Sequence, residues 1–130
     1  MKYLVLILMV MVTKVHAHGF SFDNYLKTQE ALAADDFKSA LSAHQNLCSN
    51  ELKVKHVAYQ DCGKKFKDIG ELRESFKAVT KIFATHGSTM KRKGIIEATC
   101  PMAKANWFQK EGSIANPYYG KSMLECGEKI

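Results

Sequence analysis

Two pairs of sulfur-containing side chains lie near the C-terminus of this chain. One residue separates Cys100 from Met102, and two residues separate Met123 from Cys126. Thiolate and thioether sulfur bind soft cations such as Cu(I) in preference to hard ones such as Mg²⁺. If the two pairs converge in the fold, the sequence predicts a Cu(I) or Ag(I) site made of Cys100, Met102, Met123 and Cys126.

Local geometry favours convergence within each pair. Pro101 disfavours a helical conformation at Cys100, and residues two apart in an extended segment face the same side, so Cys100 and Met102 are expected to point together. Met123 and Cys126 would share a face on a final helical turn. The same convergence would also allow a disulfide between Cys100 and Cys126, with the methionines filling gaps in the core. Both interpretations stay open at this point.

Three other residues are weaker candidates for the metal site. Trp107, the only tryptophan, is either a packing anchor or a cation-π lid over the metal. His18 could chelate Cu(II) together with a free amino terminus. His86 could reach the C-terminal tail, residues 100–130, from the end of a helix. His44 and His56 are expected on helix surfaces, where they would have no role in the site.

The first seventeen residues have the pattern of a signal peptide. Lys2 precedes an apolar run over residues 3–12 that is too short to span a membrane, and residues 15–17 have the small-residue spacing of a signal-peptidase site. We therefore expect a mature domain of residues 18–130. It would be periplasmic or secreted, with no stable membrane insertion after cleavage.

Export changes the meaning of the four cysteines. In an oxidising compartment an even number of cysteines predicts a disulfide framework. The spacing favours a bridge between Cys48 and Cys62 and a second one between Cys100 and Cys126, although spacing alone cannot establish either. All four cysteines are therefore disulfide candidates, and two of them are metal-ligand candidates as well.

Composition argues against several functional classes. A chain of 130 residues forms one domain, and its net charge of +6 is spread in short clusters rather than gathered on one face, so nucleic-acid binding is not expected. An enzyme is not expected either. No Cys-x-x-Cys motif of a thiol-disulfide exchanger occurs, and the adjacent Asp35 and Asp36 are more simply helix caps than an acid and a base.

Helical periodicity dominates the segment before the tail, and it predicts four helices. Their expected ranges are about 22–34, 36–48, 51–66 and 69–86. Asp35 or Asp36 is expected to cap the second helix and Asp68 the fourth, and Gly87 is expected to end the fourth. The first two helices could also form one kinked helix. Residues 94–99 are expected to be extended, and the glycines and prolines that follow indicate loops. The predicted fold is therefore all-α, a small bundle of about four helices with a loop-rich C-terminal cap.

The run from Cys100 to Gly127 resembles the signature of a bacterial exported family of unknown function, number three-three-four-seven among such families. Members are free-standing exported proteins or C-terminal extensions of periplasmic adaptor subunits in heavy-metal efflux systems. The resemblance implies a helical bundle, copper or silver handling, and an efflux adaptor as partner. The matching positions are Cys100, Met102, Trp107, Asn116, Pro117, Tyr118, Gly120, Met123 and Cys126. Cys48 and Cys62 lie outside the pattern, which suggests a disulfide particular to this chain.

Two functional hypotheses follow. The first is an exported soft-metal-binding module linked to metal efflux or tolerance. The second is a disulfide-stabilised periplasmic interaction domain without a metal site, in which an exposed turn at residues 116–119 or a helix face docks on another protein.

Overall fold

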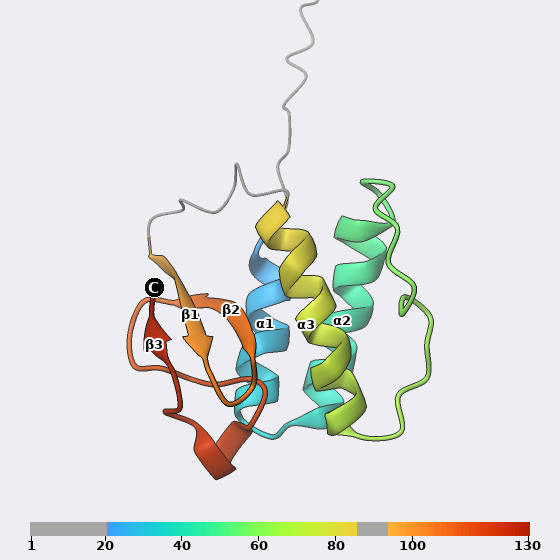
Figure 1. The fold of residues 1–130 in the computed structure, drawn as a ribbon. Helices are drawn as coiled ribbons and strands as arrows, with labels where there is room; N and C mark the ends of the chain where they lie inside the picture. The colour runs from blue at the N-terminus through green and yellow to red at the C-terminus, as the bar shows by residue number, and fades with distance from the viewer. Residues whose placement is uncertain (1–20, 86–93) are drawn as a thin grey trace, which may run out of the picture.

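The fold combines a helical layer with a small sheet. The computed structural model describes residues 21–85 and 94–130 (Figure 1). The α-helices in these ranges are α1 (Asp23–Ala33), α2 (Phe37–Leu47) and α3 (Ile69–Thr85), and the strands are β1 (Ile95–Cys100), β2 (Ala105–Lys110) and β3 (Glu128–Lys129). The strands form an antiparallel sheet in the order β2-β1-β3. None of the helices in these ranges is long and apolar enough to cross a membrane.

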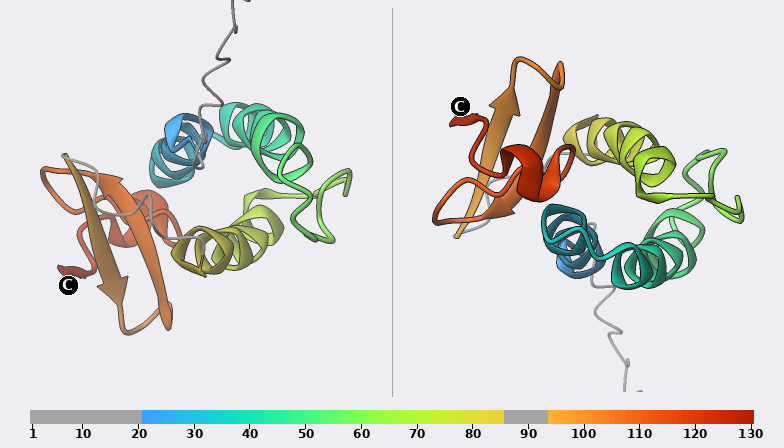
Figure 2. Two further views of the ribbon diagram at one scale, coloured as in Figure 1. Left: turned by 90° about the horizontal axis from the view of Figure 1, so that it is seen from above. Right: turned by 90° about the horizontal axis from the view of Figure 1, so that it is seen from below.

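The all-α prediction is therefore wrong, because the C-terminal segment forms a sheet and the fold is α+β. Seen along the helices, the sheet packs on α1 and α3, and α2 lies on the side away from it (Figure 2). Tyr25 of α1 is at the centre of this interface. Its ring lies 4.8 Å from the rings of both Phe76 and Phe83 in α3, and 5.9 Å from that of Phe108 in β2.

Strand β2 was not predicted from the sequence because both of its faces are covered. Trp107 and Phe108 are adjacent and therefore point to opposite faces, yet both are buried. Phe108 packs against Tyr25 of α1, and Trp107 packs against Tyr118 and beside Gly127 of the tail. A strand buried on both faces lacks the alternation of apolar and polar residues that marks a strand in a sequence.

Three of the expected helices are present, and the first two are separate as expected. Asp36 caps α2, since its carboxylate accepts a hydrogen bond from the Ser39 amide at 3.0 Å. Asp68 accepts one from the Glu71 amide at 2.9 Å at the start of α3. The expected stop of this helix at Gly87 lies outside the described residues.

The expected third helix over residues 51–66 is wrong. One turn of π-helix, η1 (Cys48–Leu52), continues α2, and turns then lead to α3. His56 and Gly63 have positive φ angles of 53° and 90°, which a helix does not allow. The predicted disulfide between Cys48 and Cys62 is confirmed, with 5.6 Å between the Cα atoms. It ties this irregular segment to the end of α2.

His44 is buried in the helical layer, so its expected place on the surface is wrong. Its side chain is almost completely enclosed, with Nε2 3.0 Å from the Tyr59 hydroxyl and the ring edge-on to Phe66. The Tyr59 hydroxyl also contacts the Ser75 hydroxyl and donates to the Ser75 carbonyl at 3.3 Å. Burial lowers the pKa of His44 to about 4, although Asp61 opposes the shift.

We expect His44 to make stability depend on pH. Because its pKa is about 4 in the folded state and near 6.5 when unfolded, the unfolded chain binds more protons between these values. The contribution is complete above pH 6.5 and is lost as the pH falls toward 4. Denaturant unfolding should show a loss of up to about 3 kcal/mol over this window, and His44→Gln should remove that part.

The exposed His56 provides a matched control, and His56→Gln should keep the loss of stability that is assigned to His44. Parallel profiles for the wild type and His44→Gln between pH 4 and 6.5 would contradict the prediction.

Candidate functional site

The structure brings the two tail cysteines together. Cys100 ends β1, where it continues the buried face formed by Ile96 and Ala98. Pairing of Thr99 with Glu128 returns the tail alongside β1, so the chain just before β3 passes next to Cys100. The Sγ atom of Cys126 lies 2.9 Å from the Sγ atom of Cys100. Cys100 is completely buried, whereas Cys126 is half-buried.

The amide of Ala103 donates a hydrogen bond to the sulfur of Cys100 at 3.4 Å. Burial by itself raises the pKa of the Cys100 thiol, but the Cys126 thiol, the backbone amides of Ala103 and Met102 and the Asn116 side chain outweigh burial and lower the pKa. The same contact raises the pKa of Cys126, so the pair favours a thiolate at Cys100 and a thiol at Cys126.

The two methionines differ in exposure. The chain turns at Pro101, where the Lys104 amide donates to the Pro101 carbonyl at 3.2 Å, so the extended conformation ends at Cys100. Met102 is 64% exposed on this turn while Cys100 is buried, and the two side chains do not share a face as expected. Met123 is half-buried at the end of a short 3-10 helix, η3 (Gly120–Met123), and its carbonyl accepts from the Cys126 amide at 3.1 Å.

Asn116 holds the loop that carries Cys126. Its side chain is completely buried, and its Nδ2 donates to the Cys126 carbonyl at 2.7 Å. Its Oδ1 accepts from the backbone amides of Tyr118 and Tyr119 at 2.8 and 3.3 Å. Its own amide donates to the Leu124 carbonyl at 2.8 Å. One side chain thus fixes both arms of the tail loop relative to each other.

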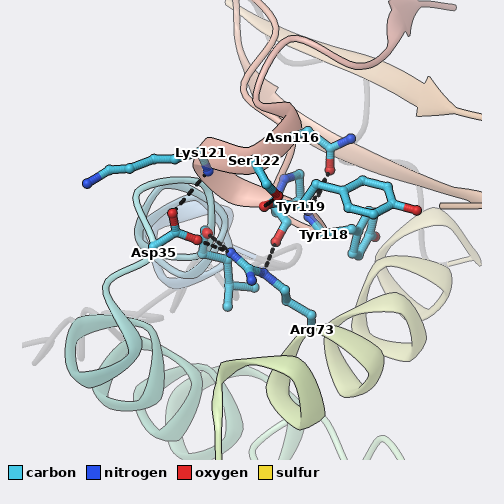
Figure 3. Close-up of polar contacts among 9 residues, drawn as sticks. Asp35, Arg73, Asn116, Tyr118, Tyr119, Lys121 and Ser122 are labelled. Atoms are coloured by element: carbon cyan, nitrogen blue, oxygen red, sulfur yellow. Dashed lines mark hydrogen bonds and ion pairs between the residues drawn. The ribbon is translucent and has the colours of Figure 1, made fainter. Parts of the chain in front are cut away.

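Arg73 anchors the other side of this loop to the helices, as Figure 3 shows. From α3, its Nε donates to the Pro117 carbonyl at 2.9 Å, and its Nη2 donates to the Leu32 carbonyl at 2.7 Å and to the Asp35 carboxylate at 2.6 Å. The second oxygen of Asp35 accepts from the Lys121 amide at 3.0 Å. The Arg73 guanidinium, and then the Lys121 amide, lower the pKa of the Asp35 carboxyl.

The end of α1 explains why an aspartate lies at this point. The Asp36 amide donates to the Ala31 carbonyl at 2.9 Å and the Asp35 amide to the Leu32 carbonyl at 3.2 Å, which is a Schellman motif. Asp35 occupies its left-handed position with a φ of 58°, where glycine is the usual residue. Its carboxylate is needed for the contacts with Arg73 and Lys121, and a glycine would lack it.

Gly127 allows the tail to approach β1 and β2. Its φ is +146°, and a Cβ atom there would lie 2.6 Å from Cη2 of Trp107 and 2.8 Å from the Thr99 carbonyl oxygen. Any other residue would push the tail outward and move the adjacent Cys126 away from Cys100.

The contacts of Trp107 agree with a packing anchor. The side chain is completely buried, its ring is edge-on to Tyr118 at 6.0 Å, and its Nε1 donates to Oε1 of Gln109 at 2.9 Å. The same Oε1 accepts from the Ala115 amide at 3.0 Å. Trp107 therefore helps to position the segment that leads to Asn116.

The remaining candidate ligands, His18 and His86, lie outside the described residues. Within residues 21–85 and 94–130, no three side chains of the types His, Cys, Asp and Glu lie together as a metal site. Any site in the described tail therefore depends on the two thiols and on methionine sulfur. The expected docking turn at residues 116–119 is mostly buried, which removes it as an exposed surface.

Sequence reasoning missed Arg73. An arginine within an amphipathic helix is most often on the solvent face, and no local signal indicates that this one meets the tail. Asn116 did belong to the tail motif, but its hydrogen bonds to residues on both sides of the loop were not foreseen.

Comparisons of the chain with protein-family models, with curated proteins and with solved structures give no match. The resemblance of the tail to the efflux-associated family therefore stays a prediction.

We expect Asn116→Asp to weaken the tail. The substitution keeps an acceptor for the Tyr118 amide but replaces the donor to the Cys126 carbonyl with a second oxygen, in a buried position. Loss of a buried hydrogen bond and burial of a charge should cost about 2 kcal/mol or more in the free energy of unfolding. Denaturant unfolding followed by Trp107 fluorescence measures this.

Asn106→Asp is the matched control, since Asn106 is exposed and bonds Glu97 at the surface. Its effect should stay within about 0.5 kcal/mol. Equal effects of the two substitutions would contradict the role assigned to Asn116.

Proposed function

We propose that this chain is an exported soft-metal-binding module. Cys100 and Cys126 would hold Cu(I) or Ag(I) as thiolates, and Met123 and Met102 would add thioether sulfur. The module would buffer the ion or pass it to a heavy-metal efflux adaptor or another periplasmic protein. The observation that carries the proposal is the 2.9 Å separation of two thiol sulfurs contributed by distant parts of the tail.

The nature of the ligand set favours a soft monovalent ion. Thiolate and thioether sulfur select Cu(I), and hard cations require oxygen ligands. A structural zinc site requires four ligands from cysteine, histidine or carboxylate, and the described part of the chain has no group of even three. Two thiols assisted by methionine therefore suit Cu(I) or Ag(I) better than zinc.

The partial exposure of Cys126 and the exposure of Met102 support the capture of a metal ion from solution. Cys126 is half-buried and Met102 is 64% exposed, so an ion could meet accessible sulfur first and then the buried Cys100. Amide donors around Cys100 stabilise a thiolate, which is the form that binds metal. The link with efflux, and with an adaptor as partner, depends on the resemblance of the tail alone.

A second candidate function is a disulfide-stabilised interaction domain without a metal site. The close approach of the sulfurs favours it equally in an oxidising compartment, and the confirmed bridge between Cys48 and Cys62 agrees with such a compartment. Since the turn at residues 116–119 is mostly buried, docking would have to use a helix face.

Competition with a colorimetric Cu(I) chelator separates the two functions. The reduced wild-type protein, kept under anaerobic conditions, should remove Cu(I) from the chelator at one equivalent per chain. Cys126→Ser should abolish removal, because one thiolate is lost, and Met123→Leu should weaken it by about tenfold or more, since a thioether ligand is replaced by an apolar group of similar size.

Met90→Leu is the matched control, because it removes a methionine outside the tail and should leave capture unchanged. Capture that is the same in Cys126→Ser as in the wild type would contradict the proposal. Tighter binding of Zn²⁺ than of Cu(I) by the same thiols, measured by competition with a Zn²⁺ chelator, would contradict the assignment of the ion.

A further inference from the structure

The two sulfurs of the thiol pair differ in accessibility and in surroundings. Cys100 is completely buried at the end of β1, whereas Cys126 is half-buried in the tail. A hydrogen-bond donor lies on the Cys100 side, where the amide of Ala103 donates to its sulfur at 3.4 Å. The backbone carbonyl of Cys126 is held by Asn116, but its sulfur contacts only Cys100 among the hydrogen bonds of the described residues.

This asymmetry matters for thiol-disulfide exchange. An incoming thiolate must approach the sulfur it attacks, and the sulfur that leaves must carry a negative charge. Of the two residues, Cys126 is partly exposed and Cys100 is buried, and Cys100 has the amide of Ala103 placed to stabilise a leaving thiolate.

We propose that Cys100 and Cys126 exchange between a disulfide and a dithiol, with Cys126 as the sulfur that external thiols attack and Cys100 as the sulfur that leaves. The external partner is a thiol of low molecular weight or an exposed protein dithiol. The disulfide requires the sulfurs to approach by roughly 0.9 Å from their separation of 2.9 Å, to the usual bond length of about 2.05 Å.

Reduction of the Cys100–Cys126 disulfide balances in two steps. An external thiolate forms a bond to Sγ of Cys126 while the Cys100–Cys126 bond breaks, and its electron pair stays on Cys100 as a thiolate. A second external thiolate then attacks the external sulfur of the mixed disulfide and releases Cys126 as a thiolate. The protein disulfide is reduced by two electrons, two external thiols are oxidised to one external disulfide, and the two new cysteine thiolates take up the protons that the external thiols lost.

Formation of the Cys100–Cys126 disulfide follows the reverse sequence. The thiolate of the accessible Cys126 first attacks an external disulfide, whose bond breaks as the mixed disulfide forms and one external thiolate leaves. The Cys100 thiolate then attacks Sγ of Cys126 and expels the second external thiolate. The hydrogen bonds of Asn116 and the approach of Gly127 to β2 hold the two sulfurs within reach for this step. Cys100 thus resolves the intermediate from inside the domain.

The consequence for metal binding rests on the function proposed above. A disulfide sulfur is not a thiolate ligand, so oxidation would close the site and reduction would open it. The exchange reaction itself involves no metal, and its test is therefore independent of copper capture.

Trapping of the mixed disulfide tests the proposal. The single variants Cys100→Ser and Cys126→Ser are incubated under native conditions with glutathione disulfide, and adducts are located by peptide mass mapping. Cys100→Ser should accumulate glutathione on Cys126, because no resolving thiol is left. Cys126→Ser should react at least about tenfold more slowly, because Cys100 is buried.

The oxidised wild-type protein supplies the same information without a substitution in the core. A brief exposure to limiting glutathione, quenched with an alkylating reagent, should give chains with glutathione on Cys126 and the alkyl group on Cys100. Circular dichroism of both variants checks that each is folded. Glutathione on Cys100 in the quenched wild type, equal reaction of the two folded variants, or no adduct in any sample would overturn the proposal.

The outcomes also separate this proposal from the proposed function. If exchange occurs at Cys126 but the reduced protein does not capture Cu(I), the metal function fails and the exchange stands. If Cu(I) is captured through both thiols but external thiols react first at Cys100, the order of exchange is wrong and the metal function stands.

Discussion

The placement of the tail depends on the hydrogen bonds that the guanidinium of Arg73 donates. This group joins the Leu32 carbonyl at the end of α1, the Asp35 carboxylate that follows, and the Pro117 carbonyl of the tail. Its side chain is only 13% exposed, so its charge requires these partners. A cation at the C-terminal end of α1 is also favoured by the helix dipole. One planar, multiply donating group therefore links the helical layer to the segment that carries Cys126.

Hydrogen bonds of buried side chains help to determine the path of the tail. Asn116 and Gln109 are buried. Asn116 bonds the Tyr118 amide and the Cys126 carbonyl on two stretches of the tail, and Gln109 bonds the Ser113 carbonyl and the Ala115 amide. A buried amide that loses one partner is destabilised by the cost of an unpaired polar group, so such side chains allow one loop conformation and disfavour others. The Cys126 sulfur is held at Cys100 by this loop, and a two-residue strand such as β3 could not hold it alone.

The thiol pair is common to the two proposed chemistries. A separation of 2.9 Å between Cys100 and Cys126 allows a disulfide to form after a small movement, and in the proposed metal site the same two sulfurs would bind one soft ion. Redox exchange relates the two chemistries, because the disulfide and the metal-bound dithiol would be alternative states of the same residues. The methionines take no part in the disulfide, so only the metal-bound state would involve their sulfur.

Local patterns in the chain were sufficient for the helices α1, α2 and α3, for the cap at Asp68, and for the extended segment before Cys100, and they limited the cap of α2 to Asp35 or Asp36. Each of these depends on residues within a few positions of one another. Spacing also favoured the pairing of Cys48 with Cys62, but it could not establish it. The sheet was not predictable in the same way. Strand β2 is covered on both faces, and β3 has two residues, so neither has a periodicity that could be recognised.

In the candidate site, too, some features follow from the sequence and others only from the tertiary structure. Residue types and spacing selected the two cysteines and two methionines, because soft-metal chemistry is a property of the sulfur atoms themselves. The meeting of Cys100 with Cys126, the exposure of Met102 and the burial of His44 depend on which distant segments pack together. Arg73 and Asn116 place the tail loop that carries Cys126, and their partners are far away in the sequence or across a loop. His44 is buried by its packing against Tyr59 and Phe66. No local pattern marks such partners, and folding alone brings them within hydrogen-bond distance.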